Sequence, residues 1–224
     1  MTLHMYPDVV QGSDEWQEQR RGMITASVVG QLITPSTLKT AANTASRSLT
    51  KLLVAERITG FSDPTYVGDD MIRGWDDEPA ARAWYNADRG PVTDIGFIAR
   101  DDWGWSLGCS PDGLVGDDGL IEIKSRRPKI HLATILANQV PAENVAQVQC
   151  ALLVSGRAWC DYLSWCGGMP PWVIRVHPDP AWQDAIVRAV AEFEQAAADM
   201  TAAYHQAVKG LPVAERTTEL EMIL

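Results

Sequence analysis

The hydrophobic pattern of the first 90 residues has a helical period. Apolar positions recur every three or four residues, which places them on one face of a helix. Two short helices around a turn at Gly22 are expected within 14–33, with Thr25 or Ser27 as cap of the second, and a further helix over 48–58. Small polar residues make 34–48 an expected loop and 60–66 an expected linker.

A fourth helix is expected to begin close to residue 76 and to run to about residue 88. Asp76 or Asp77 would cap it, and Pro79 would then lie in the first turn, where the missing N–H of proline has no helical partner to lose. The pattern therefore assigns all of the N-terminal part of the chain to helices and their connections.

From residue 92 onward, the apolar residues follow the pattern of strands. The expected strands are 92–100, 103–107, 114–115, 120–124, 159–166 and 172–177, and the GDDG segment at 116–119 is the expected hairpin turn. Helices are expected over 142–155 and, rich in alanine, over 181–208, ending at Gly210. This order predicts an α/β fold with a mixed central sheet flanked by helices, N-terminal helices and a long C-terminal helix.

Length and composition restrict the class of protein. The 224 residues suit one domain spanning 1–224. No apolar run reaches the length of a membrane span and the first residues lack a signal-peptide pattern, so we expect a cytoplasmic protein without membrane contact. The cysteines form no CxxC pair and are unlike iron–sulfur ligand runs, so four reduced thiols are expected.

The net charge of −10 excludes a protein that coats nucleic acid without specificity, because such proteins present a broad basic surface. Binding to DNA is compatible with this charge only if basic residues line a local channel on an otherwise acidic surface.

Candidate chemistry is concentrated in the segment 108–124. Residues two apart in a strand face the same side, so Glu122 and Lys124 point together while Ile121 and Ile123 point to the opposite, apolar face. The hairpin brings Asp112 close to Glu122. Two carboxylates supply the oxygen ligands that Mg²⁺ or Mn²⁺ prefers, and the lysine can orient a water or stabilise developing charge during phosphodiester hydrolysis. The alternative is an exposed hairpin with an ordinary Glu–Lys pair.

Two motifs lie within this segment and three others accompany it. In chain order, the five motifs are W-x-x-x-R-x-G-x-I-T-A-S at 16–27, G-x-x-x-E-P-x-A at 74–81, S-P-D-G at 110–113, E-I-K at 122–124 and Q-V-Q at 147–149. Together they resemble the lambda exonuclease and YqaJ-type viral recombinase family, within the PD-(D/E)XK nuclease superfamily. The resemblance covers about residues 12–165, whereas 172–210 and the tail 211–224 carry no recognised motif. It implies a restriction-endonuclease-like core.

The resemblance also implies roles for the site residues. Asp112 and Glu122 would bind the metal with the main-chain carbonyl of Ile123, and Lys124 would be the catalytic lysine. Glu78 would help to position water, although it could instead cap its helix. Gln147 would reach the site from its helix, unless Gln149 is the member of the pair that faces it.

A second group of residues would bind DNA. Arg20 and Ser27 resemble the family's pocket for a terminal 5′-phosphate, with Arg21 as an alternative to Arg20. The basic run at 124–129 includes Arg126 and Arg127 and is either a phosphate track or a solvated turn.

The activity that the resemblance implies is Mg²⁺-dependent 5′→3′ degradation of one strand at double-stranded DNA ends, leaving 3′ overhangs for phage-type recombination. Mn²⁺ is the expected substitute. The implied partners are a single-strand annealing recombinase and further copies of the chain in a ring-shaped homotrimer. The alternatives are an endonuclease, an exonuclease of opposite polarity and a non-catalytic DNA-end-binding module. Trp103 and Trp105 are either core residues or a wedge against a terminal base pair.

Overall fold

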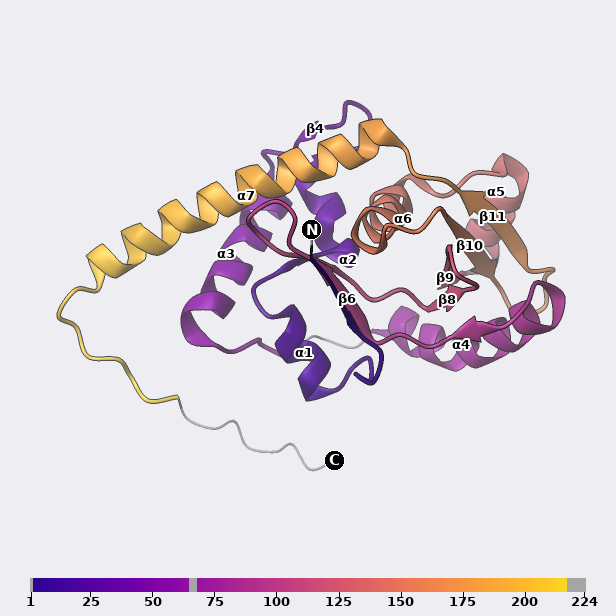
Figure 1. The fold of residues 1–224 in the computed structure, drawn as a ribbon, viewed down its shortest axis with the longest axis horizontal. Coiled ribbons are helices and arrows are strands. Elements are labelled where there is room, and N and C mark those ends of the chain that lie inside the picture. Colours follow the sequence, from indigo (N-terminus) through magenta and orange to yellow (C-terminus); the bar gives the residue numbers. More distant parts are fainter. Residues whose placement is uncertain (1, 65–67, 217–224) are drawn as a thin grey trace.

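Helices enclose two larger β-sheets in the computed structural model, which describes residues 2–64 and 68–216 (Figure 1). The five-stranded sheet has the order β11-β10-β9-β8-β5, and only its β9–β10 pair is parallel. Its strands are β5 (Val92–Thr93), β8 (Gly113–Val115), β9 (Gly119–Ser125), β10 (Trp159–Trp165) and β11 (Trp172–Val176). The expected mixed sheet and the α/β class are confirmed.

A four-stranded sheet lies on the N-terminal side of the molecule, in the order β1-β6-β7-β2. Its strands are β1 (Leu3–Tyr6), β2 (Ile24–Thr25), β6 (Phe97–Arg100) and β7 (Leu107–Cys109), and a small ladder joins β3 (Ile33–Thr34) to β4 (Lys39–Thr40). The sequence pattern did not predict β1, which is short and exposed.

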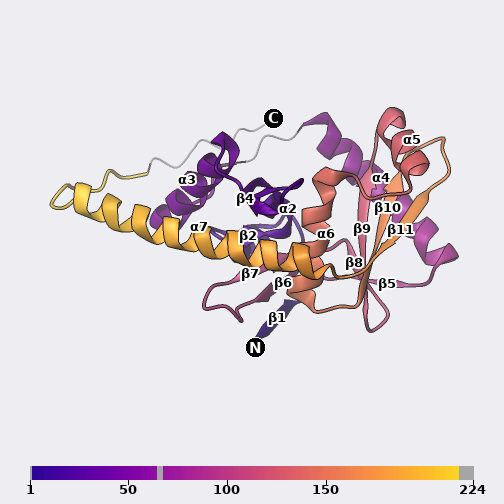
Figure 2. The same ribbon diagram turned by 90° about the horizontal axis from the view of Figure 1, so that it is seen from above.

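The helices pack on both faces of the sheets. They are α1 (Asp14–Arg20), α2 (Ala26–Val29), the 3₁₀ turn η1 (Gly30–Leu32), α3 (Thr44–Thr59), α4 (Asp69–Asp88), α5 (Pro128–Ala137), α6 (Ala142–Ser155) and α7 (Pro180–Ala207). Helix α6 contacts β6, β7 and β10, whereas α4 packs against β9 and β10. The long helix α7 crosses α3 and α6 (Figure 2). No helix in the described ranges is long and apolar enough to cross a membrane.

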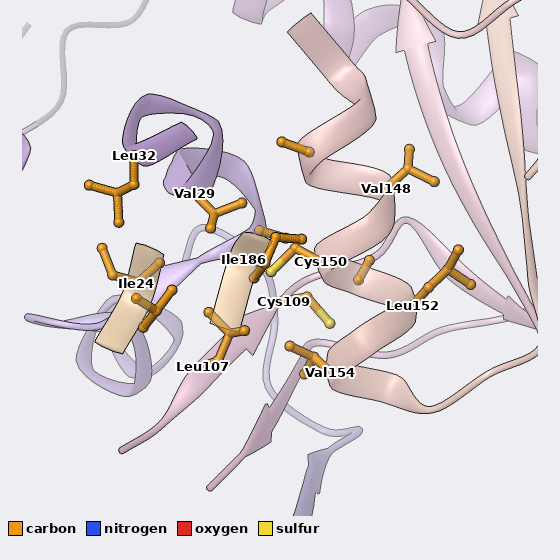
Figure 3. Packing of buried hydrophobic residues seen from close by; sticks show 14 of the residues in the cluster. Ile24, Val29, Leu32, Leu107, Cys109, Val148, Cys150, Leu152, Val154 and Ile186 are labelled. Carbon is orange, nitrogen blue, oxygen red and sulfur yellow. The ribbon is translucent and has the colours of Figure 1, made fainter. Parts of the chain in front are cut away.

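The main core surrounds α6 (Figure 3). Cys150 and Val154 project from one side of this helix toward Ile24, Val29, Leu32, Leu107 and Cys109, whereas Val148 and Leu152 project from its opposite side. All four cysteines are buried and free, as expected for reduced thiols. Helix α6 is therefore fixed on several sides, and any polar residue that it carries toward the sheet is held rigidly.

A smaller apolar cluster lies between α4 and the other face of the five-stranded sheet. Ile121 and Ile123 of β9 pack there with Ala81 and Tyr85 of α4. Below them, the buried carboxylate of Asp161 accepts a hydrogen bond from the Tyr85 hydroxyl at 2.7 Å and two from Arg175 at 2.8 and 2.9 Å. Apolar packing and this polar network together fix α4 on the sheet.

The predicted strand over 92–100 is wrong as a single strand. It is divided between β5 in one sheet and β6 in the other, and the chain changes sheet just before Gly96. A Cβ at Gly96 would lie 1.8 Å from the main-chain oxygen of Val9, so only glycine allows this close passage. The strand predicted at 103–107 is also displaced, to 107–109, because Gly104 adopts a left-handed φ of +80° between the two tryptophans.

The predicted start of α4 is wrong as well. The helix begins at Asp69 after Gly68 as N-cap, so neither Asp76 nor Asp77 caps it and Pro79 lies in its interior. Asp69 and Asp70 occupy the first turn, where negative charge is favourable to the helix dipole. Proline costs about 3 kcal/mol in a helix interior. The packing of α4 on the sheet offsets this cost, and local sequence pattern gives no information about that packing.

Several other boundaries differ from the predictions. Helix α3 starts at Thr44 because Asn43 and Ser46 form a capping box, so the predicted loop is shorter. Helix α5 was not predicted, because its apolar residues are not confined to one face and give no amphipathic period. The second N-terminal helix is only α2 with η1, and Thr25 is its N-cap without a side-chain capping bond. Residues 65 and 66 of the linker and 217–224 of the tail lie outside the described residues.

The turn at Gly22 is held by two charged residues of α3. The Gly22 N–H donates to Glu56 at 2.7 Å, and the Arg57 Nε donates to the Gly22 carbonyl at 2.6 Å. The same guanidinium donates twice to Glu194 of α7, at 2.7 Å each. A Cβ at Gly22 would lie 2.5 Å from Cγ of Arg57, which these contacts prevent from moving away.

We expect Gly22→Ala to destabilise the protein more than Gly60→Ala. Both glycines have a left-handed φ, +67° and +64°, but nothing lies within 4 Å of a Cβ built at Gly60. The additional loss for Gly22→Ala should be about 1–3 kcal/mol, the usual cost of forcing a group into filled space. Urea unfolding of both variants measures the difference, and equal losses would show that the contact with Arg57 is unimportant.

Candidate active site

Asp112, Glu122 and Lys124 come together at the open end of the β8–β9 hairpin, away from its turn. Asp112 directly precedes β8, and its Oδ2 accepts a hydrogen bond from the Ile123 N–H at 2.5 Å. Lys124 Nζ lies 2.7 Å from Glu122 Oε1. The side chains of β9 alternate as the sequence suggests, with Ile121 and Ile123 in the apolar cluster under α4.

Helix α6 adds a glutamine to this cluster. Gln147 Nε2 donates to Glu122 Oε1 at 2.5 Å, so one carboxylate oxygen of Glu122 is shared by an amide and an ammonium. Gln149 faces elsewhere, since its amide donates to the His177 carbonyl and accepts from the Asp179 N–H. Of the two glutamines, Gln147 is the one at the site.

Helix α4 approaches the cluster from the other face of the sheet. Arg82 donates to the main-chain carbonyl of Asp112, contacts Glu78 Oε1 at 3.4 Å and donates to Asp94 at 2.9 Å. Glu78 is half-buried, and its charge contributes to the upward shift of the Asp112 pKa, so it is within electrostatic reach of the site. Since α4 starts at Asp69, Glu78 does not cap this helix.

The carboxylates of Asp112 and Glu122 repel each other, and this repulsion shifts the pKa values in the cluster. Burial and the neighbouring charge of Glu122 raise the pKa of Asp112 well above its usual value, while Lys124 and the Ile123 N–H act in the opposite direction. Burial lowers the pKa of Lys124, but Glu122 and Asp112 outweigh it, so the net shift is upward and the ammonium stays protonated. One lysine cannot neutralise all of this negative charge.

The donor set fits a hard divalent cation with several waters. Asp112 and Glu122 offer carboxylate oxygens, and their mutual repulsion would be relieved by positive charge between them. Within the described ranges, no three His, Cys, Asp or Glu side chains form a closed cage. A cation here would therefore complete its shell with water and substrate oxygens, as Mg²⁺ commonly does. The Ile123 carbonyl as third ligand stays a prediction.

A second polar cluster forms around Arg20. Its guanidinium donates to Ser110 at 3.3 Å, Thr25 at 3.3 Å and Ser27 at 3.2 Å, and its Cζ lies 3.9 Å from the centre of the Trp16 ring. Burial lowers the pKa of Arg20 to about 10, with opposing effects of Cys109 and Glu56, so it remains charged at neutral pH. The neighbouring Arg21 instead approaches Glu18 at 4.0 Å.

The Arg20 cluster and the carboxylate cluster are neighbours. Ser110, which also accepts from the Trp16 indole N–H at 2.8 Å, lies two residues before Asp112. A cavity of about 330 Å³ between α2 and α6 has Ser27 and Gln147 in its walls. Of the predicted site residues, only these two line this cavity, and the Arg20 cluster is joined to the carboxylates through the Ser110–Asp112 segment.

Arg126 and Arg127, the residues of the predicted phosphate track, point in different directions. Arg126 turns inward and donates to Asn144 and to the Tyr162 hydroxyl. Arg127 is exposed and donates to Asp70 at the start of α4, at 2.9 and 3.0 Å. The two residues therefore do not form one continuous basic strip.

Sequence reasoning missed Arg82, Trp16 and Ser110 as site residues, although the last two belong to recognised motifs. Their contacts join segments 30 to 94 residues apart, so local spacing gave no signal for them. Trp103 and Trp105 stack with ring centres 4.9 Å apart and pack against the main core, which favours a core role for both.

Comparison with known proteins agrees with the motifs. The chain matches the YqaJ-like viral recombinase domain over residues 15–158. No curated protein matches it. Among solved structures, it is similar to the alkaline exonuclease LHK-Exo from Laribacter hongkongensis, with 29% identity over 87% of this chain and all of the other, at a TM-score of 0.74.

Two further structures show the same architecture. LHK-Exo in complex with dAMP is 30% identical, over 89% of this chain and all of the other, with a TM-score of 0.79. A phage-related exonuclease from Haemophilus somnus 129PT is 13% identical over 80% of this chain and 96% of the other, with a TM-score of 0.59, and supports the fold alone. By motif order and by the extent of these matches, the chain belongs to the YqaJ-like viral recombinase family.

Proposed function

We propose that this protein is a magnesium-dependent exonuclease that degrades the 5′-ended strand of double-stranded DNA and leaves 3′ overhangs. The observation that carries the proposal is the convergence of Asp112, Glu122, Lys124 and Gln147 beside the Arg20 cluster, in a chain similar to an alkaline exonuclease. Mn²⁺ would substitute for Mg²⁺, since both accept the same oxygen ligands.

The proposed mechanism assigns the metal to Asp112 and Glu122, with the Ile123 carbonyl. The cation supplies Lewis-acid stabilisation of the charge that develops on the phosphoryl oxygens. Lys124, held protonated by its two acidic neighbours, orients the attacking water and adds positive charge near the reacting phosphate. Gln147 holds Glu122 in place through its amide.

Glu78 and Arg82 act from α4 in this mechanism. Arg82 joins Glu78 to the main chain of Asp112, so α4 and the start of β8 keep a fixed relative position. Glu78 can then accept a hydrogen bond from a water in the site. The Tyr85–Asp161 hydrogen bond supports this geometry one turn farther along α4.

The 5′-phosphate would be bound by Arg20 and Ser27. A guanidinium surrounded by several hydroxyl groups suits a phosphate dianion, because both kinds of group can donate hydrogen bonds to its oxygens. The hydroxyls of Thr25, Ser27 and Ser110 already converge on Arg20. Binding the terminal phosphate here would place the first phosphodiester at the carboxylates and explain a preference for ends.

We further propose that the protein acts as a homotrimer with a single-strand annealing recombinase as partner, in a phage or prophage context within the host cytoplasm. Exposed apolar side chains on α5, Leu132 and Leu136, support association with other protein surfaces. Because the net charge is −10, the DNA-facing surface of such a ring would have to be locally basic. The molar mass in solution tests the oligomeric state.

Substitution of the lysine should remove most of the cleavage activity. We expect Lys124→Ala to lower Mg²⁺-dependent release of a 5′-end label from a linear duplex by at least about 100-fold, because a charge aimed at the reacting phosphate is lost. Lys129→Ala, an exposed lysine on α5, is the matched control and should retain activity.

The same assay distinguishes the alternatives. Loss of a 3′-end label first would indicate the opposite polarity, and cleavage of a closed circle would indicate an endonuclease. If wild type cleaves no DNA with Mg²⁺ or Mn²⁺, the non-catalytic binding module is the better explanation.

Removal of one repelling carboxylate should stabilise the metal-free protein. We expect Asp112→Asn to raise the melting temperature in EDTA by about 2–4 °C, the shift produced by roughly 1 kcal/mol in a protein of this size. Mg²⁺ should stabilise wild type but not the variant, since only wild type offers both carboxylates. Equal responses of the two proteins to Mg²⁺ would place the cation elsewhere.

The 5′-phosphate pocket predicts a loss of substrate discrimination. Wild type should degrade a 5′-phosphorylated duplex faster than a 5′-hydroxyl duplex, and Arg20→Gln should reduce that ratio by about tenfold, as expected for one charge-assisted interaction. Arg21→Gln is the matched control. The assignment is wrong if Arg20→Gln lowers both rates equally, or if Arg21→Gln alone removes the preference.

A further inference from the structure

A second cavity has Lys124 in its wall but not Gln147. It has a volume of about 300 Å³ and lies between the start of α4, the end of β9 and the start of α5. Its walls include four cationic side chains, Arg73, Lys124, Arg126 and Arg127, and one acidic side chain, Asp70. In a protein with a net charge of −10, this is a local concentration of positive charge.

Asp70 is held between two of these arginines. Its Oδ1 accepts hydrogen bonds from Arg73 Nη1 at 2.7 Å and from Arg127 Nη2 and Nε at 2.9 and 3.0 Å. These bonds lower the pKa of Asp70 below its usual value, so it is ionised at neutral pH. One anionic oxygen therefore sits between two guanidinium groups, the environment that a phosphate oxygen would also prefer.

The arrangement contributes little to the stability of the fold. The side chains of Asp70 and Arg127 are 65% and 63% exposed, and ion pairs of this kind are screened by solvent. Arg73 has a second anchor that does not depend on Asp70: its Nε donates to Ser125 at 3.0 Å. At least one of the two guanidinium groups thus keeps its position if Asp70 leaves.

The cavity is connected to the candidate active site through Lys124. Glu122 contacts both Lys124 and Gln147, and Gln147 lines the other cavity, beside Ser27. These contacts give an order of neighbours: the Arg20 cluster, the carboxylates, Lys124, then the arginine pair. A strand held by its terminal phosphate at Arg20 and passing the carboxylates would next meet Arg73 and Arg127.

We propose that Arg73 and Arg127 form a second phosphate-binding site, for a backbone phosphate on the 3′ side of the scissile bond, and that Asp70 occupies this site until DNA displaces it. The inference rests on the proposed nuclease function and assigns a further contact to the same substrate. Displacement of an internal carboxylate makes binding weaker than two free arginines would give.

The direction in which Asp70→Asn changes DNA affinity distinguishes a phosphate-binding site from a structural salt bridge. If the three residues only stabilise the fold, Asp70→Asn and Arg73→Gln should act in the same direction. If the arginines bind phosphate, Arg73→Gln should weaken DNA binding, whereas Asp70→Asn should strengthen it by about threefold at low salt, because a competing negative charge is removed.

The experiment measures binding of the full chain to a 5′-phosphorylated duplex, with Ca²⁺ in place of Mg²⁺, at several salt concentrations. The variants are Asp70→Asn, Arg73→Gln, Arg127→Gln and the double arginine variant. Arg89→Gln, at the exposed C-terminal end of the same helix, is the charge-matched control. The double variant should bind about 10-fold more weakly, and the slope of log K against log salt should fall by about 1.

Duplexes with one uncharged methylphosphonate linkage locate the phosphate. Neutralising one linkage near the 5′ end should weaken wild type and have no further effect on the double arginine variant, since both changes remove the same contact. Additive effects at every linkage, or a salt slope equal to that of Arg89→Gln, would overturn the proposal, as would weaker binding by Asp70→Asn.

Wild-type cleavage of the same duplex with Mg²⁺ is measured in parallel. If wild type does not cleave but the arginine and methylphosphonate effects are found, the phosphate site stands and the proposed function fails. If wild type cleaves and these effects are absent, the phosphate site alone is wrong.

Discussion

The buried carboxylate of Glu122 is the constraint on which the site depends. Only 3% of this residue is exposed, and an unpaired buried carboxylate would cost several kcal/mol. Lys124 and Gln147 both bond the same oxygen of Glu122, and Asp112 stands beside it with a raised pKa. The fold therefore has to bring a strand, its hairpin partner and a helix to one point.

The two faces of β9 contact different helices. On one face, Glu122 meets α6, which is fixed in the main core. On the other, Ile121 and Ile123 pack under α4, which the Tyr85–Asp161 bond holds in place. Helix α4 then returns to the active site through Arg82 and to the second cavity through Arg73. A shift of α4 on the sheet would therefore alter the active site and the second cavity together.

Local sequence pattern predicts the centre of this arrangement well and its surroundings poorly. Strand alternation at Glu122 and Lys124 and the hairpin turn before them are properties of a few adjacent residues. The start of α4 depends on Gly68 and on packing that offsets Pro79, and the break at Gly96 depends on Val9 passing close by. Contacts of Arg82 and Ser110 join distant segments, so no local spacing indicates them.

Several arginines of this acidic protein are already paired with carboxylates of the same chain. Arg57 is bound to Glu194, Arg82 to Glu78 and Asp94, and Arg127 to Asp70, so much of the positive charge is already neutralised by internal carboxylates. Duplex DNA lying anywhere on such a surface would find few free cations. In the proposed function, affinity would come from places where a phosphate can replace a carboxylate or join a cluster of hydroxyls. A strand end that reaches all of these places would then be favoured over the uniform backbone of a duplex.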